Sequence, residues 1–435
     1  MDVRIWIRWA AMHAVPGAFL AVQARRGDPL ARFLLKGAAG AEHYRVIEAI
    51  RQRGRLVRTP FVWVSADHEL CRTMLRDNRF GAVDPAKSGL PKPLTALIAR
   101  VDPGLPNPVE PPAMLMVDPP EHTRYRRLVA HSFTPRAIDR LGDRVTEMTT
   151  QLLDTFEAGQ QVDLLSAFAE QLPVAVIAEI LGLPVQARPR LLTCGHRAAP
   201  LLDVGIKWTT YRQAVEGLRD LDDYLGDHFD RIRHRDSADT PFARLALDGT
   251  LTHRELAANA ALLIGAGFET TVNLIGNGIV TLLDHPEQLA RLHEDPSLWP
   301  NAIEEILRYD PPVQRMVRIA LHDIEIAGHH IAAGETVILL PAGANRDPHV
   351  FTDPDRFDIT RPNAADHLAF GTGVHACIGA ALARVEGGTA LRALFDTFPA
   401  LRLTTAPEKR ELVTLNGYRR LPAHLGAKAP AATRN

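Results

Sequence analysis

The longest apolar stretch of the chain covers residues 256–283. It carries one formal charge, Glu269. Such a run is long enough to cross a membrane. However, it contains three asparagines, and Glu269-Thr270-Thr271 stands near its centre. A helix buried on all sides inside a large protein has the same pattern. We therefore predict a long central core helix.

Apolar residues recur with a helical period in several other segments, which prolines and glycines separate. The clearest predicted helices are 43–53, 68–76, 145–156, 167–181 and 211–233, with further helix starts near residues 118 and 345. Short segments at 55–59, 61–65, 323–331 and 336–340 predict strands, the first two forming a hairpin. Residues 81–112 sustain no apolar period, so we expect a long functional or disordered loop. The pattern predicts a mainly α fold with a small β-rich lobe.

Residues 1–42 form a candidate N-terminal extension that is expected to be helical. From Trp9 to Ala24 no residue carries a formal charge, but Pro16 and Gly17 interrupt the run. The run is too short and broken for a membrane span, and no small-residue cleavage site follows it. A helix lying on a membrane surface is one alternative. We favour packing against the rest of the protein and predict no transmembrane anchor.

Composition narrows the function classes. The chain has 435 residues, of which 46% are hydrophobic, and a formal net charge of −1. This balance gives no general reason to expect nucleic acid as a partner. Three cysteines are too few for a disulfide framework, which favours a reducing, cytoplasmic location. Residues 426–435 are small and polar, and we expect a flexible tail.

Residues 370–379, FGTGVHACIG, are a second informative stretch. Gly371 and Gly373 permit a tight loop, and a run of helix formers begins at Ala380. Cys377 would then lie near a helix N-terminus, which favours a thiolate. On these grounds alone, a small buried cysteine is the commoner interpretation. A zinc site lacks further Cys and His ligands, and nothing marks the base that a cysteine nucleophile needs.

The whole pattern, Phe-Gly-x-Gly-x-His-x-Cys-x-Gly followed by Leu-Ala-Arg and Glu386, resembles the haem-binding signature of the cytochrome P450 family. The resemblance implies Cys377 as the axial thiolate ligand of haem iron, an arrangement that favours O–O cleavage. It places Phe370, Gly371 and Gly379 at the cofactor, haem b, which would lie between the central helix and the Cys377 loop. It implies a single catalytic domain over residues 43–425 with the cytochrome P450 fold.

The centre of the long helix matches the oxygen-activation motif of the same family. Ala266 and Gly267 would let haem and O2 approach the helix, and Thr270 with Glu269 would deliver protons. A mid-helix threonine can also simply bond to its own backbone carbonyls, which is the structural alternative for Thr270.

Four basic residues match the family's partners of the haem propionates. His122 and Arg126 are four apart and share a helical face, and an arginine fork suits a carboxylate. The resemblance adds His375 and Arg318 to this set. Without it, His122 and Arg126 would be taken for part of a solvated basic face.

Glu305 and Arg308 match the family's Glu-x-x-Arg element. At this spacing an acid and a base on a helix commonly form a surface pair. The resemblance makes Arg356 their partner in a structural triad that locks the core behind the Cys377 loop.

The resemblance implies a monooxygenase that inserts one atom of O2 into a small, hydrophobic organic substrate. No Gly-x-Gly-x-x-Gly fingerprint follows a strand, so electrons are expected from a separate ferredoxin or flavodoxin and its reductase. Candidates for a basic docking face, with ordinary solvated arginines as the alternative, are Arg72, Arg76, Arg124, Arg127 and Arg384. The alternative functions are a peroxide-driven haem enzyme, a non-enzymatic haem sensor or carrier, and a structural interaction protein.

Overall fold

The computed structural model describes residues 2–36, 41–84, 86–87, 89, 91–235 and 240–430. The predicted flexible tail covers residues 426–435, and its last five residues lie outside the described part of the chain. The helices of the N-terminal half are α1 (Val3–Trp9), α2 (Val15–Arg25), α3 (Pro29–Lys36), α4 (Ala41–Arg51), α5 (His68–Arg76), α6 (Lys92–Arg100), α7 (Glu121–Ala130), α8 (Pro135–Asp154), α9 (Gln171–Leu181) and α10 (Arg188–Ala198). Those that follow are α11 (Trp208–Arg235), α12 (Pro241–Asp248), α13 (His253–Asp284), α14 (Pro286–Glu294), α15 (Trp299–Tyr309), α16 (Pro341–Ala344) and α17 (Ala380–Thr397).

The strands are short. They are β1 (Val57–Arg58), β2 (Trp63–Ser65), β3 (Phe80–Gly81), β4 (Gln161–Asp163), β5 (Met316–Ala320), β6 (Ile324–Ile326), β7 (His329–Ile331), β8 (Thr336–Leu339), β9 (Arg402–Leu403), β10 (Glu408–Lys409), β11 (Tyr418–Arg420) and β12 (Pro422–His424). The predicted mainly α fold with a small β-rich lobe is confirmed.

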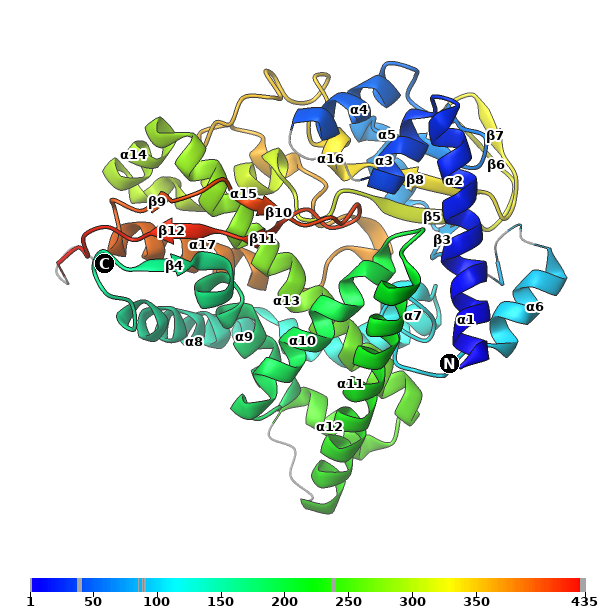
Figure 1. Ribbon diagram of the computed structural model, residues 1–435, viewed down its shortest axis with the longest axis horizontal. Coiled ribbons are helices and arrows are strands. Elements are labelled where there is room, and N and C mark those ends of the chain that lie inside the picture. The colour runs from blue at the N-terminus through cyan, green and yellow to red at the C-terminus, as the bar shows by residue number, and fades with distance from the viewer. Residues whose placement is uncertain are drawn as a thin grey trace.

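The predicted central helix is α13, which runs through the middle of the molecule (Figure 1). Thr252 caps its first turn, because the Thr252 hydroxyl accepts from the Glu255 N–H while the Glu255 carboxylate accepts from the Thr252 N–H. From Leu256 to Leu282 every residue is buried except Gly265, Ala266, Gly267 and Thr270. A wide, uncharged surface lets α13 pack against helices on several sides, which is why its sequence is apolar all round.

The largest sheet has five strands in the order β1-β2-β8-β5-β3. The predicted hairpin is confirmed, since β1 and β2 pair antiparallel with Val57 opposite Val64. Strand β8 joins β2 in parallel and β5 in antiparallel register, with Arg318 opposite Val337. Strand β5 was not expected from the sequence, and it positions Arg318.

Two local predictions were wrong. The segment 81–112 is not one loop, because α6 spans Lys92–Arg100 within it. Pro91 is the N-cap residue of α6 and Pro93 lies in its first turn, where a missing N–H costs nothing. Asn345 ends α16 as its C-cap and begins no helix.

The N-terminal segment is helical, and α1, a π-helical turn at Ala10–Ala14 and α2 form one continuous rod at the edge of the molecule (Figure 1). By length and composition, Val3–Arg25 and α13 could each cross a membrane. The apolar window of α13 is 78% buried in the protein, against 22% for the N-terminal rod. The apolar character of α13 is therefore explained by the core, whereas that of the rod is not.

Candidate functional site

The Cys377 loop is held by glycine and backbone contacts. Gly371 and Gly373 have φ of 62° and 75°, which L side chains rarely adopt. At Gly373 a Cβ would lie 2.3 Å from the Leu75 carbonyl oxygen, so the loop packs directly on the end of α5. The Cys377 N–H donates to the Phe370 carbonyl at 2.9 Å. Two residues beyond Cys377, Gly379 caps α17.

The Cys377 thiol is exposed, although it lies deep in the fold, and it is the exposed one among the three cysteines. Burial raises the pKa of this thiol, while the Gly379 N–H and the charges of Arg126 and Arg384 act in the opposite direction. The other two thiols, of Cys71 and Cys194, are buried, and burial raises the pKa of each to about 12. Cys377 is therefore the cysteine that an incoming group can reach.

The central helix is open where the oxygen-activation motif was predicted. Ala266 is exposed, Gly265, Gly267 and Thr270 beside it are partly exposed, and a Cβ on Gly265 would meet nothing within 4 Å. Beside this opening lies a small, mainly apolar pocket formed by α10, α11, α13 and the 101–113 segment. Its lining residues are Pro108, Cys194, Gly195, Ala198, Leu218, Leu221, Ala261, Ile264 and Gly265. The lining is of the kind that binds a hydrophobic molecule.

Thr270 lies on the open side of α13, and Glu269 on the closed side. The Thr270 hydroxyl donates to the Ala266 carbonyl at 2.7 Å, as in the structural alternative. Glu269 is 1% exposed and forms an ion pair with Arg410, which the sequence analysis missed. Arg410 also lies 3.8 Å from Glu170 and donates to the His196 Nε2 at 3.4 Å. The second oxygen of Glu269, Oε2, accepts no hydrogen bond from the described residues.

The four predicted propionate partners form a basic cluster. The rings of His122 and His375 meet with their centroids 4.3 Å apart. Burial, with the charges of neighbouring arginines, lowers the pKa of both imidazoles, and that of His375 falls to about 3. Burial also lowers the pKa of Arg318. The structure thus gathers His122, Arg126, Arg318 and His375 around one region.

This basic cluster lacks an anion. Within the described residues, no carboxylate forms an ion pair with Arg126 or Arg318, and His122 Nδ1 has no hydrogen-bond partner. The acid that acts on the cluster, Asp118, already binds Lys87 at 2.6 Å. Buried cations without a counter-charge are costly. Two propionate carboxylates would supply the missing charge, so the residues fit haem.

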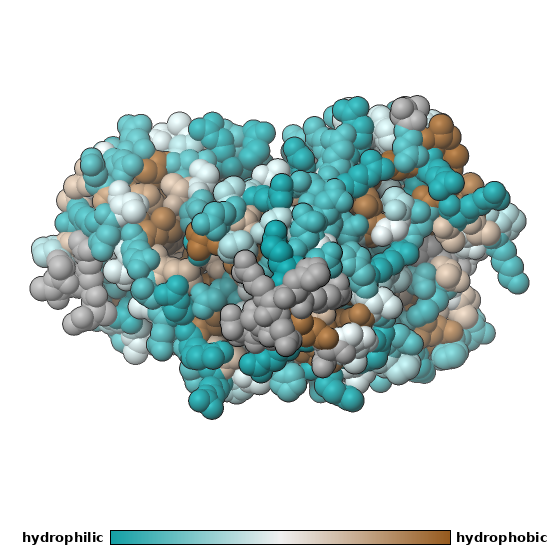
Figure 2. Space-filling view, turned by 90° about the horizontal axis from the view of Figure 1, so that it is seen from below, coloured by the Kyte–Doolittle hydropathy of each residue, from teal (hydrophilic) through white to brown (hydrophobic). Residues whose placement is uncertain are grey.

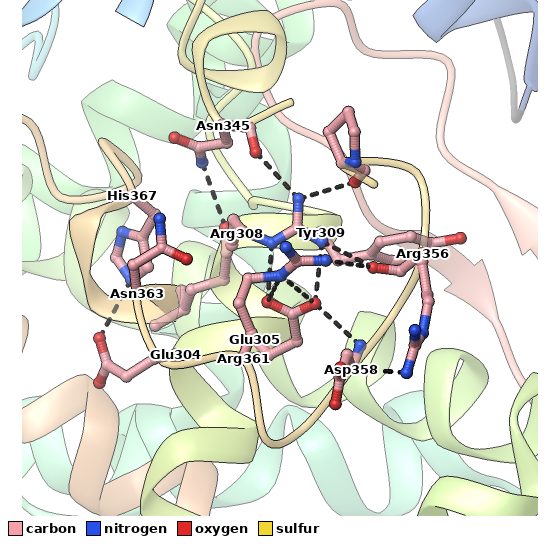
Figure 3. Close-up of polar contacts among 12 residues, drawn as sticks. Glu304, Glu305, Arg308, Tyr309, Asn345, Arg356, Asp358, Arg361, Asn363 and His367 are labelled. Atoms are coloured by element: carbon pink, nitrogen blue, oxygen red, sulfur yellow. Dashed lines mark hydrogen bonds and ion pairs between the residues drawn. The ribbon is translucent and has the colours of Figure 1, made fainter. Parts of the chain in front are cut away.

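The structural triad required a correction (Figure 3). Glu305 and Arg308, both fully buried, pair through two hydrogen bonds of 2.7 and 2.8 Å. The third member is Arg361, whose Nε lies 3.2 Å from Glu305, and the prediction of Arg356 was wrong. The Arg356 guanidinium turns outward to Asp358, and only its carbonyl accepts from Arg308 and Arg361.

The five candidate docking arginines fall into two groups. Arg124 and Arg384 are already paired, with Glu255 and with Glu304. The other three are exposed: Arg72, Arg76 and Arg127. The Cα of Arg76 would lie 2.9 Å from a Cβ on Gly373, so the end of α5 adjoins the Cys377 loop.

Comparison with known proteins decides the family. A family model described as Cytochrome P450 matches residues 215–417. The putative cytochrome P450 140 of Mycobacterium tuberculosis is 45% identical over 427 residues, which are 97% of each chain. The chain belongs to the cytochrome P450 family.

Further relatives and structures of the family agree. The 6-deoxyerythronolide B hydroxylase of Saccharopolyspora erythraea is 40% identical over 315 residues, covering 71% of this chain and 76% of the relative. Ligand-free CYP164A2 of Mycobacterium smegmatis has a TM-score of 0.80 at 35% identity, covering 91% of this chain and 99% of that one. The chain therefore has the cytochrome P450 fold and is a haem-thiolate monooxygenase.

Proposed function

We propose that this cytochrome P450 binds haem b through Cys377 and inserts one oxygen atom from O2 into a small hydrophobic substrate. The observation that carries the proposal is the pairing of an exposed thiol at Cys377 with a basic cluster that lacks its anion. When bound, thiolate-ligated haem supplies the activation of O2. The protein supplies the ligand, the counter-charges, the pocket and the protons.

The basic cluster would orient the cofactor. Arg126 and Arg318 would bind the propionates through charge-assisted hydrogen bonds, and His122 Nδ1 and the ring of His375 would complete the set. Phe370, Gly371 and Gly379 would keep the Cys377 loop close to the haem, and the exposed Ala266 would leave room for it on α13. Gly267 faces α9 instead, since a Cβ there would lie 3.0 Å from the Ile177 side chain.

Thr270 would act at the open side of α13. The Thr270 hydroxyl donates its hydrogen to the Ala266 carbonyl. The lone pairs of its oxygen therefore remain free to accept a hydrogen bond from water. Glu269 is held by Arg410 and must leave this ion pair, or take a proton within it, to act as a proton donor. We therefore assign positioning of water to Thr270 and proton supply to Glu269, with Arg410 controlling the latter.

The apolar lining beside Gly265 matches a hydrophobic substrate in character. Electrons would come from a separate ferredoxin or flavodoxin with its reductase. Such acidic proteins would dock near Arg72 and Arg76, which are exposed next to the Cys377 loop. We propose a cytoplasmic enzyme with residues 43–425 as its catalytic domain, preceded by the extension 1–42 and followed by the tail 426–435.

A spectrum tests the ligand. The reduced protein with CO should show the strongly red-shifted Soret band of thiolate ligation, and Cys377→His should lose it. Cys71→Ser removes a buried thiol and is the matched control, which should retain the band. A histidine-like spectrum of the unmutated protein would exclude the proposed ligand.

Turnover tests the proton assignment. With a surrogate redox chain and a substrate found by Soret-shift screening, Thr270→Ala should keep haem content but release peroxide in place of product. Glu269→Gln should slow turnover, and Arg410→Gln should change the rate through Glu269. A Thr270→Ala variant that couples reductant to product as well as the parent would contradict the role of Thr270. Peroxide-driven turnover unaffected by changes at both positions would favour the peroxide-driven alternative.

A further inference from the structure

The N-terminal rod, residues 3–25, turns its polar side chains inward. Between Ile5 and Ala24 its polar side chains are Arg8, His13 and Gln23, and all three are buried, at 5%, 8% and 7% exposure. A helix on the surface of a soluble protein normally places such side chains outward. The inward face of the rod thus holds these three polar side chains together with the buried Ile5 and Leu20.

The outward face of the rod is apolar. Eight large hydrophobic residues are exposed in the described part of the protein, and five of them belong to the rod. They are Val3, Trp6, Val15, Phe19 and Val22, each at least 42% exposed. On the face of the molecule seen in Figure 2, apolar residues instead form only small patches among hydrophilic ones. Large exposed apolar areas mark interaction sites.

The inward side of the rod is firmly attached. Arg8 donates to the Ile98 carbonyl at 2.7 Å and pairs with Glu110. The Trp9 indole donates to the Ile206 carbonyl at 2.9 Å. A Cβ on Gly17 would lie 2.9 Å from the Cα of Gly205, so backbone touches backbone there. The rod cannot cross a bilayer without breaking these contacts and carrying the charge of Arg8 into lipid.

Arginines flank the apolar face of the rod, and one acid stands beyond each end, the exposed Asp2 and the half-buried Asp28. Residues 3–25 contain no carboxylate, and exposed arginines stand at both ends, Arg4 at one and Arg25 with Arg26 at the other. An apolar face with tryptophan and phenylalanine, flanked by arginines, is the composition of a helix that lies in a membrane interface. Each arginine near an anionic surface contributes about 1 kcal/mol.

The area of the rod argues against a second copy of the chain. The rod has 23 residues, and a helix of that length is about 35 Å long and about 10 Å wide. Its outward face therefore offers roughly 350 Å², well below the roughly 800 Å² that each partner contributes to a stable dimer. A lipid surface has no such minimum, because the hydrocarbon accepts any apolar area presented to it.

We propose that residues 3–25 dock this protein on anionic membrane surfaces, with the rod lying in the headgroup region and the rest of the protein outside. Val15, Phe19 and Val22 insert between the headgroups, and Arg4, Arg25 and Arg26 bind their phosphates. Because the rod is fixed to the segments around Ile98 and Ile206, the body adopts one orientation on the membrane.

Vesicle flotation tests the proposal with the full-length, haem-loaded protein. The unmutated protein should float with vesicles of equal parts phosphatidylglycerol and phosphatidylcholine, and much less with phosphatidylcholine alone. The triple variant Val15→Gln, Phe19→Gln, Val22→Gln should bind at least about tenfold more weakly, since three apolar side chains no longer leave water. Arg25→Gln with Arg26→Gln should weaken binding and reduce its salt dependence.

Val185→Gln is the matched control, because Val185 is 61% exposed but lies far from the rod in sequence. This variant should float like the parent. Haem content and circular dichroism show that each variant is folded. Absence of flotation with anionic vesicles, equal flotation with both lipids, or an unaffected triple variant would overturn the proposal. A dimer in sedimentation that the triple variant dissociates, without vesicle binding, would assign the apolar face to a second copy instead.

Discussion

Two groups of charges in this protein differ in completeness. In the first, Glu305 accepts from Arg308 and Arg361, and both arginines also donate to backbone carbonyls. In the second, the buried Arg318 and the half-buried Arg126 meet no carboxylate within the described residues. A complete group is consistent with a structural role. An incomplete one indicates a ligand that carries the missing charge.

The largest expected effect comes from breaking the complete group. Glu305→Ala leaves Arg308 and Arg361 buried without their anion, which should cost about 3–5 kcal/mol of stability. Urea unfolding of the apo-protein measures this loss. Glu325→Ala is the control, because the Glu325 side chain is 75% exposed in a surface pair with His330. Loss of the Glu325 carboxylate should lower the free energy of unfolding by less than about 1 kcal/mol. Equal stabilities of the two variants would contradict the structural role.

A second prediction concerns acid. Burial opposes ionisation of Glu304, but its neighbours His367 and Arg384 outweigh it and lower the pKa of this carboxyl from 4.5 to about 2. The lowered pKa stabilises the fold above pH 4.5, and the contribution is lost as the pH falls towards 2. It amounts to at most about 3 kcal/mol. Glu304→Gln should therefore flatten the pH dependence of unfolding between about pH 5 and 3, measured by urea titration. A slope equal to that of the parent would show that these bonds contribute little.

A third prediction separates the two groups directly. Arg318→Met should weaken haem binding about 10- to 100-fold, since one charge-assisted bond is lost. The same change should leave the apo-protein as stable as before or more stable, because it removes a buried cation that pairs with no carboxylate within the described residues. Haem transfer to a scavenging apoprotein and urea unfolding measure the two quantities.

Arg315→Met is the matched control for Arg318. Arg315 is also buried, but it lies 3.6 Å from Asp203 and donates to the Thr414 hydroxyl. Its loss should reduce stability, and haem affinity should change little. If both variants lose stability alike, Arg318 is a structural residue and the incomplete group is not a binding site.

The smallest effect is expected at Arg356. Its side chain is 63% exposed and pairs with Asp358. Arg356→Ala should therefore change the free energy of unfolding by less than about 1 kcal/mol. The carbonyl that Arg308 and Arg361 use remains in the variant. Arg361→Ala is expected to be several times more damaging. The reverse order would restore the triad predicted from the sequence.

This last pair shows what sequence could and could not predict. The Cys377 motif is long and local, so the family and fold followed from it. The Glu305–Arg308 spacing is also local, within one helix turn. The third partner comes from an irregular loop, where spacing does not tell which of Arg356 and Arg361 turns inward. Asp358 lies between them and attracts Arg356 outward.

Partners that lie far apart in the chain could not be predicted from the sequence for a related reason. Arg410 follows the short strand β10 and lies 141 residues from Glu269, and no periodic pattern links them. For the N-terminal rod, the sequence was informative about composition but not about orientation. Its apolar composition was visible, but which side faces the protein depends on the π-helical turn at Ala10–Ala14 and on partners such as Glu110 and Tyr211.

The incomplete group has a consequence for how the protein matures in a cell. Before haem arrives, Arg126 and Arg318 meet no carboxylate within the described residues, so small anions should bind beside them and stabilise the newly made chain. Apo-protein should then melt at a higher temperature in phosphate than in an uncharged buffer of equal ionic strength. Haem supply during expression would decide how much of the chain escapes proteolysis, because the cofactor itself completes the core.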